Sequence, residues 1–166
     1  MGERLTQGDV EKIKQEIEYR TLVVRKEAIG AVQEARAQGD LSENFEYYAA
    51  KKDKNKNESR IRYLERMLKN ATIISDDSAE GVVGLNKQIE VYLEDEDVTE
   101  TFKLVTSVRC DSISGKISIE SPMGKAINGH RVGDRVFVRI NDRIGYYVVI
   151  RSITDGDDSD DTIRPY

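Results

Sequence analysis

Apolar residues along the first part of the chain recur at helical spacing. The positions that step by three, four or seven residues are Val10, Ile13, Ile17, Val24, Ala28, Ala31 and Ala35. Residues at these intervals share one face of a helix and approach the heptad repeat of a coiled coil. The pattern predicts one long helix from Gly8 to about Ala37, with Gly30 as its weak point.

A second helical pattern starts near Ser42 or Glu43 and continues to about Asn70. Its apolar positions are Ala50, Ile61, Leu64 and Leu68. Lys54 and Asn57 occupy the seam positions between Ala50 and Ile61, so we expect weak hydrophobic packing near the start of this helix and strong packing at its far end.

About four residues, Gln38 to Leu41, join the two helical patterns. So short a joint makes consecutive helices antiparallel neighbours. About thirty residues at 1.5 Å each give a hairpin roughly 45 Å long, which is longer than a small domain needs.

The pattern changes from helical spacing to alternation after the polar stretch SDDSAEG at 75–81. Five later segments alternate apolar and polar residues and read as strands: QIEVYLE, TFKLVTSV, GKISIE, DRVFVRI and GYYVVIRSI. INDRIG makes the last two a hairpin. SPMGKAINGH fits a short helix, with Ser121 as N-cap, Pro122 in the first turn and Gly129 past the end.

These patterns predict an α+β fold in two parts. Residues 1–75 form an N-terminal antiparallel α-helical coiled-coil hairpin, and residues 76–154 form a small curved antiparallel β domain with one short helix. Residues 155–166 hold five Asp between positions 155 and 161. So acidic a segment predicts a disordered, exposed tail.

Composition supports a cytoplasmic protein with no membrane segment. Apolar residues make up 38% of the 166 residues and charged residues 34%, and no apolar run is long enough to span a bilayer. The single cysteine, Cys110, cannot form an internal disulfide, which suits a reducing compartment. Residues 1–74 carry 15 Lys and Arg against 13 Asp and Glu, whereas residues 75–166 carry 11 against 18. The two parts therefore differ in their surroundings.

The joint between the helices carries two acids three residues apart, Asp40 and Glu43. An Asp-x-x-Glu pair at a helix start is a capping box, in which each side chain bonds the other residue's amide. The same spacing places two carboxylates about 5–6 Å apart on one face, which suits a hydrated Mg²⁺. Two carboxylates are an incomplete site, so metal chemistry here requires a partner that supplies more ligands. Both interpretations stay open at this point.

A basic cluster follows the joint. Its members are Lys51, Lys52, Lys54, Lys56, Arg60 and Arg62. Such a run is either a solvated helix face or a set of phosphate contacts, which are salt-sensitive and independent of sequence. Beside it, Tyr47 with Phe45 and Tyr48 either packs across the hairpin or stacks on a base.

The sequence gives little indication of a catalytic histidine or cysteine, a zinc site or a nucleotide-binding loop. His130 and Cys110 are the only residues of their kinds, so no His-based catalytic pair or zinc site is assembled. No phosphate-binding loop or dinucleotide glycine pattern is present.

Four segments together resemble the Gre-type transcript cleavage factors (GreA/GreB) of bacterial RNA polymerase. They are LTQGDVEKIKQEIEYR, EARAQGDLSENFEYYAAK, ESRIRYLERMLKNATII and SPMGKAINGHRVGDRVFV. The resemblance runs from about Leu5 to Ile153 in the same order and spacing. It implies a coiled coil followed by an FKBP-like domain that docks at the mouth of the polymerase secondary channel, while the hairpin reaches the active centre.

The resemblance also implies roles for particular residues. Asp40 and Glu43 match the tip acids that help hold an Mg²⁺ ion jointly with the polymerase, so the metal is weakly bound or absent in the free protein. Ser42, Asn44 and Tyr47 support the tip. Arg36 and Lys51 match positions of the basic patch that contacts the 3′ end of the nascent RNA. We extend this patch to Lys52, Lys54 and Lys56, although Lys54 and Lys56 stand where relatives commonly have a neutral stretch. The segment that faces the polymerase comprises Ser121, Pro122, Met123 and Gly124.

The leading hypothesis is a monomeric elongation factor that binds RNA polymerase and stimulates the polymerase's own cleavage of backtracked RNA, without being an enzyme by itself. The alternative is a Gre-like channel binder that inhibits or regulates without cleavage. The Asp-Leu-Ser-Glu arrangement of the joint favours the first, since it is not a denser acid cluster. A third possibility is a coiled-coil chaperone, which would not bind the polymerase.

Overall fold

The computed structural model describes residues 2–39 and 44–165. The chain divides into two compact units. The first unit is the helical segment Val10–Ala71. The second combines Glu3–Asp9 with Thr72–Tyr166, so the start of the first helix belongs with the C-terminal domain. Within the described part of the chain, no helix is long and apolar enough to cross a membrane.

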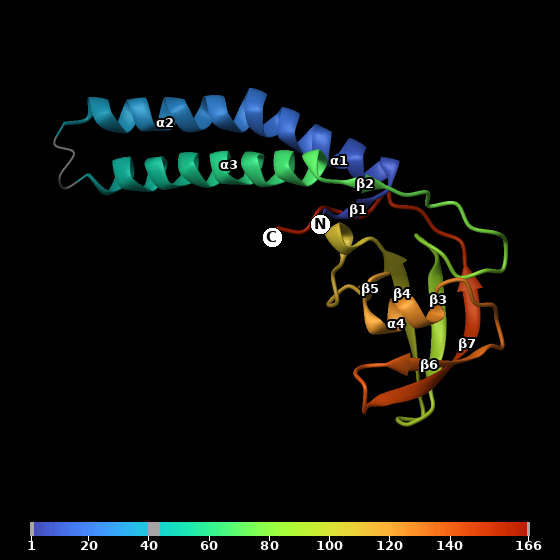
Figure 1. Cartoon of the computed structure of the whole chain (residues 1–166). Helices are drawn as coiled ribbons and strands as arrows, with labels where there is room; N and C mark the ends of the chain where they lie inside the picture. Colours follow the sequence, from blue (N-terminus) through green and yellow to red (C-terminus); the bar gives the residue numbers. More distant parts are fainter. Residues whose placement is uncertain (1, 40–43, 166) are drawn as a thin grey trace. The chain divides into compact units, whose positions relative to one another are not determined.

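The first unit is a pair of long helical segments (Figure 1). One segment runs through α1 (Gln7–Tyr19), a π-helical turn η1 (Arg20–Val24) and α2 (Arg25–Ala37). The other is α3 (Phe45–Lys69), which packs along α2. The predicted first helix is confirmed in extent, but the apolar spacing did not reveal its π-helical turn.

A buried asparagine accounts for the π-helical turn. Asn57 on α3 is 4% exposed, and its Nδ2 donates to the Arg20 carbonyl at 3.1 Å. Arg20 Nη1 donates back to Asn57 Oδ1 at 3.1 Å, and the Arg25 amide also donates to the Arg20 carbonyl. An inserted side chain that bonds a helix carbonyl is a recognised cause of such irregularity. The seam is therefore polar and hydrogen-bonded at Asn57.

Ion pairs reinforce this polar section of the hairpin. Glu16 accepts from Arg60 at 2.8 and 3.1 Å and from Arg20 at 2.7 Å. Burial raises the pKa of the Glu16 carboxyl, but the hydrogen bonds from Arg60 and Arg20 outweigh it, and the net pKa lies below the usual value. Arg25 binds Glu58 with two hydrogen bonds of 2.9 Å. Farther along α3, apolar packing resumes with buried Ile61, Leu64 and Met67.

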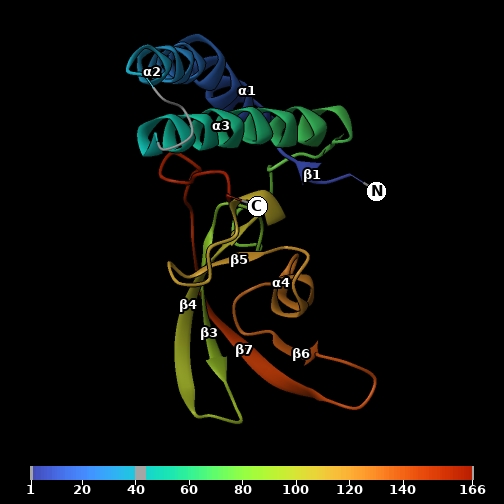
Figure 2. The same ribbon diagram turned by 90° about the vertical axis from the view of Figure 1, so that its left-hand side faces the viewer.

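The second unit is built on a five-stranded sheet in the order β5-β4-β3-β7-β6 (Figure 2). Its strands are β3 (Gln88–Leu93), β4 (Val98–Val105), β5 (Lys116–Ser118), β6 (Arg135–Arg139) and β7 (Gly145–Thr154). Four strands pair antiparallel, but β5 pairs parallel to β4. The prediction of a purely antiparallel sheet is therefore wrong at β5, because the chain reaches β5 through the short helix η2 (Ser107–Arg109) and a loop rather than a hairpin.

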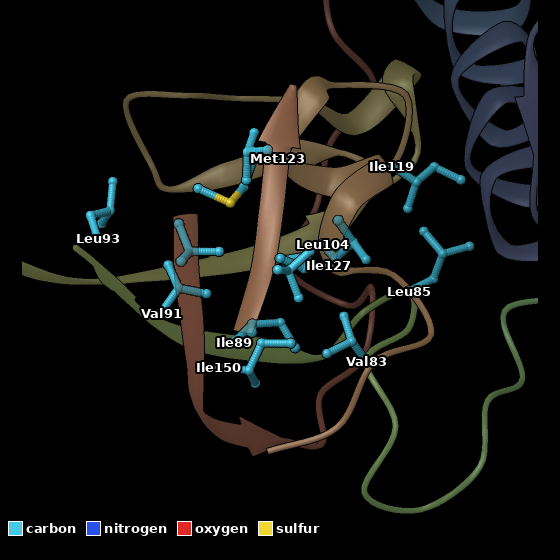
Figure 3. Packing of buried hydrophobic residues seen from close by; sticks show 13 residues of the cluster. Val83, Leu85, Ile89, Val91, Leu93, Leu104, Ile119, Met123, Ile127 and Ile150 are labelled. Atoms are coloured by element: carbon cyan, nitrogen blue, oxygen red, sulfur yellow. The ribbon is translucent and has the colours of Figure 1, made fainter. Parts of the chain in front are cut away.

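The alternation of the strands places one face of the sheet in the core (Figure 3). Ile89, Val91 and Leu93 of β3 are buried, as strict alternation predicts. The short helix α4 (Pro122–Ile127) packs Met123 and Ile127 into this cluster. The core therefore lies between α4 and one face of the sheet.

The N-terminal segment joins this unit through a small parallel pair. Strand β1 (Arg4–Leu5) pairs with β2 (Thr72–Ile73). At the start of α1, the Asp9 carboxylate accepts from the Thr6 amide at 3.0 Å, and the Thr6 hydroxyl accepts from the Asp9 amide at 3.2 Å. This reciprocal pair is a capping box with Asp in the acidic position.

The acidic C-terminal segment is exposed at Asp155, Asp157 and Asp160, as predicted, but the prediction of an exposed tail is wrong for some of its last residues. Asp161 is 3% exposed and Ile163 is 8% exposed. The Arg164 amide donates to the Val108 carbonyl at 2.8 Å, and Arg164 Nη2 donates to Glu3 at 2.6 Å. The segment is therefore packed into the second unit at these residues.

Asp161 belongs to a buried ionic cluster. The Arg109 side chain is fully buried and donates from Nη1 to Asp161 at 2.6 Å, while its Nε lies 2.5 Å from Asp9 Oδ1. Lys103 Nζ lies 3.0 Å and Lys116 Nζ 2.9 Å from Asp161 Oδ1. Burial raises the pKa of the Asp161 carboxyl, but hydrogen bonds from Lys116, Lys103 and Arg109 together lower it below its usual value. The cluster connects the start of α1, η2, two strands and the C-terminal segment.

Candidate functional site

The two candidate metal-binding acids, Asp40 and Glu43, lie outside the described residues, as do Leu41 and Ser42. The predicted spacing of the two carboxylates therefore stays a prediction. The residues on either side are described and define where the joint begins and ends. Gly39 follows α2 with a φ of +116°, a conformation that glycine adopts without strain.

Asn44 fixes the other end of the joint. It is the N-cap of α3, and its Oδ1 accepts from the Tyr47 amide at 3.0 Å. Its Nδ2 donates to the Ala35 carbonyl at 2.7 Å, which ties the start of α3 to the last turn of α2. The second helix therefore starts at Phe45, later than predicted, and its N-cap is Asn44 rather than Asp40. A side chain that caps one helix and bonds the other holds the ends of the joint together.

Tyr47 packs across the hairpin behind the joint. It is 9% exposed, and the Arg36 guanidinium carbon lies 5.7 Å from the centre of its ring. The hydrogen bond from Arg36 lowers the pKa of the Tyr47 phenol, burial opposes this, and the charge of Lys51 adds to the lowering. Of the two interpretations of this residue, packing is the one observed.

Two neighbouring aromatic residues are not buried. Phe45 is 85% exposed and Tyr48 is 52% exposed. The Tyr48 ring meets the Tyr47 ring edge-on, with centroids 5.4 Å apart. Phe45, in the first turn of α3, is therefore the aromatic residue here that is free to meet a partner.

The basic cluster separates into two groups. Arg36, Lys51, Lys52 and Lys56 are exposed and Lys54 is partly exposed. Within the described residues, these four lysines form no ion pair at 4 Å or less. Arg60, which the sequence places in the same run, is instead buried against Glu16. The structure thus leaves the lysine side chains available to a phosphate and assigns Arg60 to the helix interface.

The segment Ser121–Gly124 has a strong local role. The Ser121 hydroxyl caps α4 by accepting from the Gly124 amide at 3.0 Å, and it donates to the Ser118 carbonyl at 2.6 Å. Met123 and Gly124 are buried, whereas Pro122 is exposed. The predicted N-cap is confirmed. Pro122 is the one residue of this segment that is exposed and so accessible to a partner.

Gly124→Ala should destabilise the second unit. A Cβ at this position would lie 2.0 Å from the Ser118 carbonyl oxygen, which is backbone and cannot swing away. Overpacking of this kind costs about 1–3 kcal/mol, measurable by thermal denaturation of the full chain. Gly30→Ala is the matched control, because nothing lies within 4 Å of its Cβ and alanine stabilises a helix interior. Equal melting temperatures for the Gly124 variant and the parent would contradict this account of the close approach.

Metal ligands are scarce in the described part of the chain. Among residues 2–39 and 44–165, no group of three or more His, Cys, Asp or Glu side chains is placed to hold a metal ion. The oxygen donors of Asp40 and Glu43 suit Mg²⁺ in kind, but two carboxylates leave most of an octahedral shell open. These two residues fit a shared ion better than a site that this chain completes alone.

Comparison with known proteins identifies the family. Residues 3–73 match the family description "Transcription elongation factor, N-terminal", and residues 77–155 match "Transcription elongation factor, GreA/GreB, C-term". Transcription elongation factor GreA of Geobacillus kaustophilus is 43% identical over 136 residues, covering 81% of this chain and 86% of the relative. The GreA of Clostridium acetobutylicum is 38% identical over 149 residues, covering 88% and 93%. The chain belongs to the GreA/GreB family of transcription elongation factors.

Two solved structures are also similar to this chain in sequence and coverage. The crystal structure of GreA factor homolog 1 (Gfh1) of Thermus thermophilus is 29% identical, covers 92% of this chain and 99% of its own, and gives a TM-score of 0.44. The transcription elongation factor GreA/GreB from Nitrosomonas europaea is 17% identical and covers 93% and 98%, with a TM-score of 0.39.

Proposed function

We propose that this chain is a transcription elongation factor that binds bacterial RNA polymerase and stimulates the polymerase's own cleavage of backtracked nascent RNA. The observation that carries the proposal is the acidic joint of the helical hairpin in a member of the GreA/GreB family. Relatives about 40% identical over most of the chain bear the name transcription elongation factor GreA.

The hairpin suits the presentation of a small acidic group at a distance. The residues between Gly39 and Asn44 are the joint of two helical segments, and Asn44 bonds both of them. Buried Tyr47 fills the space behind the joint. Holding the ends of the joint in place reduces the conformational freedom that would otherwise be lost when a partner binds.

Asp40 and Glu43 would hold Mg²⁺ jointly with carboxylates of the polymerase. When bound between two sets of ligands, such an ion lowers the pKa of a water and stabilises the leaving oxygen of a phosphodiester. This chain would contribute two carboxylates to the polymerase active site, which already uses metal ions. By this account the chain has no cleavage activity alone.

The exposed basic residues would contact the RNA backbone next to the joint. Arg36, Lys51, Lys52 and Lys56 are exposed, and a lysine binds phosphate as a point charge without regard to sequence. Phe45 would stack on a base near the 3′ end, since its ring is almost fully exposed one residue after the cap. Pro122 and its surroundings in the second unit would face the polymerase surface.

Lys51→Gln combined with Lys52→Gln should raise the factor concentration needed for half-maximal cleavage and make it less sensitive to salt. Each lost phosphate contact to single-stranded RNA flattens the log–log salt dependence by about 0.7, so the pair should flatten it by about 1.4. The measurement is cleavage rate against factor concentration between low and moderate salt. Lys69→Gln, on the last turn of the same helix, is the control and should behave like the parent. If the salt dependence of the double variant equalled that of the parent, Lys51 and Lys52 would not contact the RNA phosphates.

The experiment that tests the function adds the chain to a stalled, backtracked elongation complex and follows the RNA from its 3′ end. The proposal expects shortening that requires both the polymerase and this chain. Cutting of RNA by the chain without polymerase would make it a nuclease and contradict the proposal. Binding to the polymerase with slowed cleavage would support the alternative of a Gre-like inhibitor, and no binding would support the chaperone.

A further inference from the structure

The sheet of the second unit has an outer face that α4 does not cover. Strand β6 shows the division clearly, because Val136 and Val138 point into the core while Arg135, Phe137 and Arg139 are exposed. Residues paired in register share a face, so β7 and β3 continue it. We call this the arginine–aromatic face, and its members are Tyr92, Arg135, Phe137, Arg139, Tyr147 and Arg151.

The Phe137 ring lies over Gly145 of the neighbouring strand. Its neighbour β7 carries Gly145, where a Cβ would lie 2.3 Å from Phe137 Cζ and 2.7 Å from Phe137 Cε2, so the ring occupies the space over the glycine. Its register partner Tyr147 has its ring centroid 5.0 Å away, at 49°. Phe137 is 42% exposed and Tyr147 is 40% exposed. The phenyl ring therefore packs on Gly145 and Tyr147, and part of its surface is open to solvent.

Two arginines stack on tyrosines of the same face. The Arg135 guanidinium carbon lies 3.6 Å from the centre of the Tyr147 ring, and that of Arg151 lies 4.9 Å from the centre of the Tyr92 ring. Arg135 is also held by Glu94 with hydrogen bonds of 2.7 and 3.0 Å, yet its side chain is 55% exposed. Its planar group is thus fixed in orientation before any partner arrives.

The charge of this region differs in sign from the rest of the domain. Residues 131–151 contain five arginines, no lysine and two aspartates, a balance of +3. The remainder of residues 75–166 contains six Lys and Arg against 16 Asp and Glu, a balance of −10. On the face itself, Glu90 of β3 and Glu94 just after this strand offset part of this charge, and Glu94 pairs with Arg135. The positive charge that remains open to a polyanion on this face is that of Arg139 and Arg151.

We propose that the arginine–aromatic face binds single-stranded nucleic acid, with bases stacking on Phe137 and on the Arg135–Tyr147 pair and phosphates meeting Arg139 and Arg151. Open rings on adjacent strands of a sheet, flanked by cations, are the combination that single strands bind without sequence preference. An acidic protein segment would use the arginines but not the exposed surface of the Phe137 ring, so this ring favours nucleic acid. The proposal does not rest on the cleavage function, since it concerns the free chain and another part of the fold.

The test measures fluorescence anisotropy of a labelled single-stranded RNA of about 12 nucleotides, a length within the range that one sheet platform binds. The lysines of the hairpin also attract RNA, so every protein carries Lys51→Gln and Lys52→Gln. Phe137→Leu keeps an apolar cover over Gly145 but removes the aromatic ring, and Tyr147→Leu does the same for its neighbour. Each change should raise the Kd by about 5-fold or more, as loss of one stacked base does.

Two controls distinguish the loss of base stacking from a loss of folding and from a general attraction of anions. Phe137→Tyr retains an aromatic ring and should therefore retain the parent Kd. Weak binding by the leucine variant together with normal binding by the tyrosine variant would point to stacking and not to a general requirement for phenylalanine in the fold. Inorganic polyphosphate should compete weakly with the RNA, because it has charge but no bases. An unchanged Kd in both leucine variants would overturn the proposal, and so would competition by polyphosphate as strong as that by unlabelled RNA, which would indicate attraction of any anion.

Discussion

Asp40→Asn is expected to lower the rate of stimulated RNA cleavage by about 100-fold or more while leaving binding to the polymerase within about 2-fold. Replacing even an outer-sphere partner of a metal costs 10–100-fold in affinity or activity, so loss of a ligand charge should cost at least the upper part of that range. Asparagine is nearly isosteric with aspartate and caps a helix about as well. Since Asn44 already caps α3, the substitution should not disturb the start of that helix.

Glu43→Gln should have a similar effect, and Glu46→Gln is the matched control. Glu46 lies in the first turn of α3, is exposed and has the same charge, but no role is assigned to it. With the Glu46→Gln variant, the rate of stimulated cleavage should stay within about 2-fold of the parent rate. The effect of losing one negative charge elsewhere on the surface is small, because salt screens it. If Glu46→Gln lowered cleavage as much as Asp40→Asn, the assignment of the chemistry to Asp40 and Glu43 would be wrong.

Arg109→Met is expected to destabilise the second unit by about 3–5 kcal/mol, since removal of one partner from a buried ion pair leaves uncompensated charge. Asp9 and Asp161 both depend on this guanidinium, at 2.5 and 2.6 Å. For a unit of this size, the loss corresponds to a fall in melting temperature on the order of 15 °C or more. Thermal denaturation of the full chain, followed by near-ultraviolet circular dichroism, measures it.

Arg4→Met provides the comparison for an exposed ion pair. Arg4 lies 2.9 Å from Glu120, and their side chains are 54% and 40% exposed. Such pairs contribute at most about 1 kcal/mol, so the melting temperature should change little. Equal effects of Arg109→Met and Arg4→Met would contradict the importance of burial. Adding Asp161→Asn to Arg109→Met should cost less than the sum of the single changes, because the two groups interact directly.

The same cluster makes the second unit sensitive to acid. The pKa of Asp161 is lower in the folded chain than its ordinary value of 3.8, so the unfolded chain binds more protons near that pH. The stability that Asp161 contributes is therefore fully present above about pH 4 and is lost as pH falls toward the lower folded pKa. Asp161→Asn should remove this part of the pH dependence.

Periodicity predicted the main elements because apolar residues recur at a regular spacing in each of them. The helix from Gly8 to Ala37 and the alternating strands were visible for this reason. The π-helical turn was not, because it depends on Asn57, which lies on the other helix and is distant in sequence. Likewise, nothing in the sequence distinguishes Asp161 from the four other aspartates between positions 155 and 161. Only the positions of Arg109, Lys103 and Lys116 select it for burial.

The candidate site was predictable in part for a related reason. The acids of the joint and the lysines beyond it form a local motif that a sequence displays directly. The Asp-x-x-Glu spacing suggests a capping box at Asp40, whereas in the structure Asn44 combines capping with a bond to Ala35 across the hairpin. That second bond is tertiary, so the spacing of residues along the chain does not reveal it. The arginine–aromatic face escaped notice because its residues are shared among three strands.

The central claim is that carboxylates of this chain help to hold Mg²⁺ at the polymerase active centre. The most direct measurement is the Mg²⁺ concentration that gives half-maximal cleavage of one backtracked RNA, with no factor, with the parent chain and with Asp40→Asn, each at saturating factor. The account predicts that the parent chain lowers this concentration and that Asp40→Asn returns it toward the value without factor. The same Mg²⁺ requirement in all three reactions would contradict it.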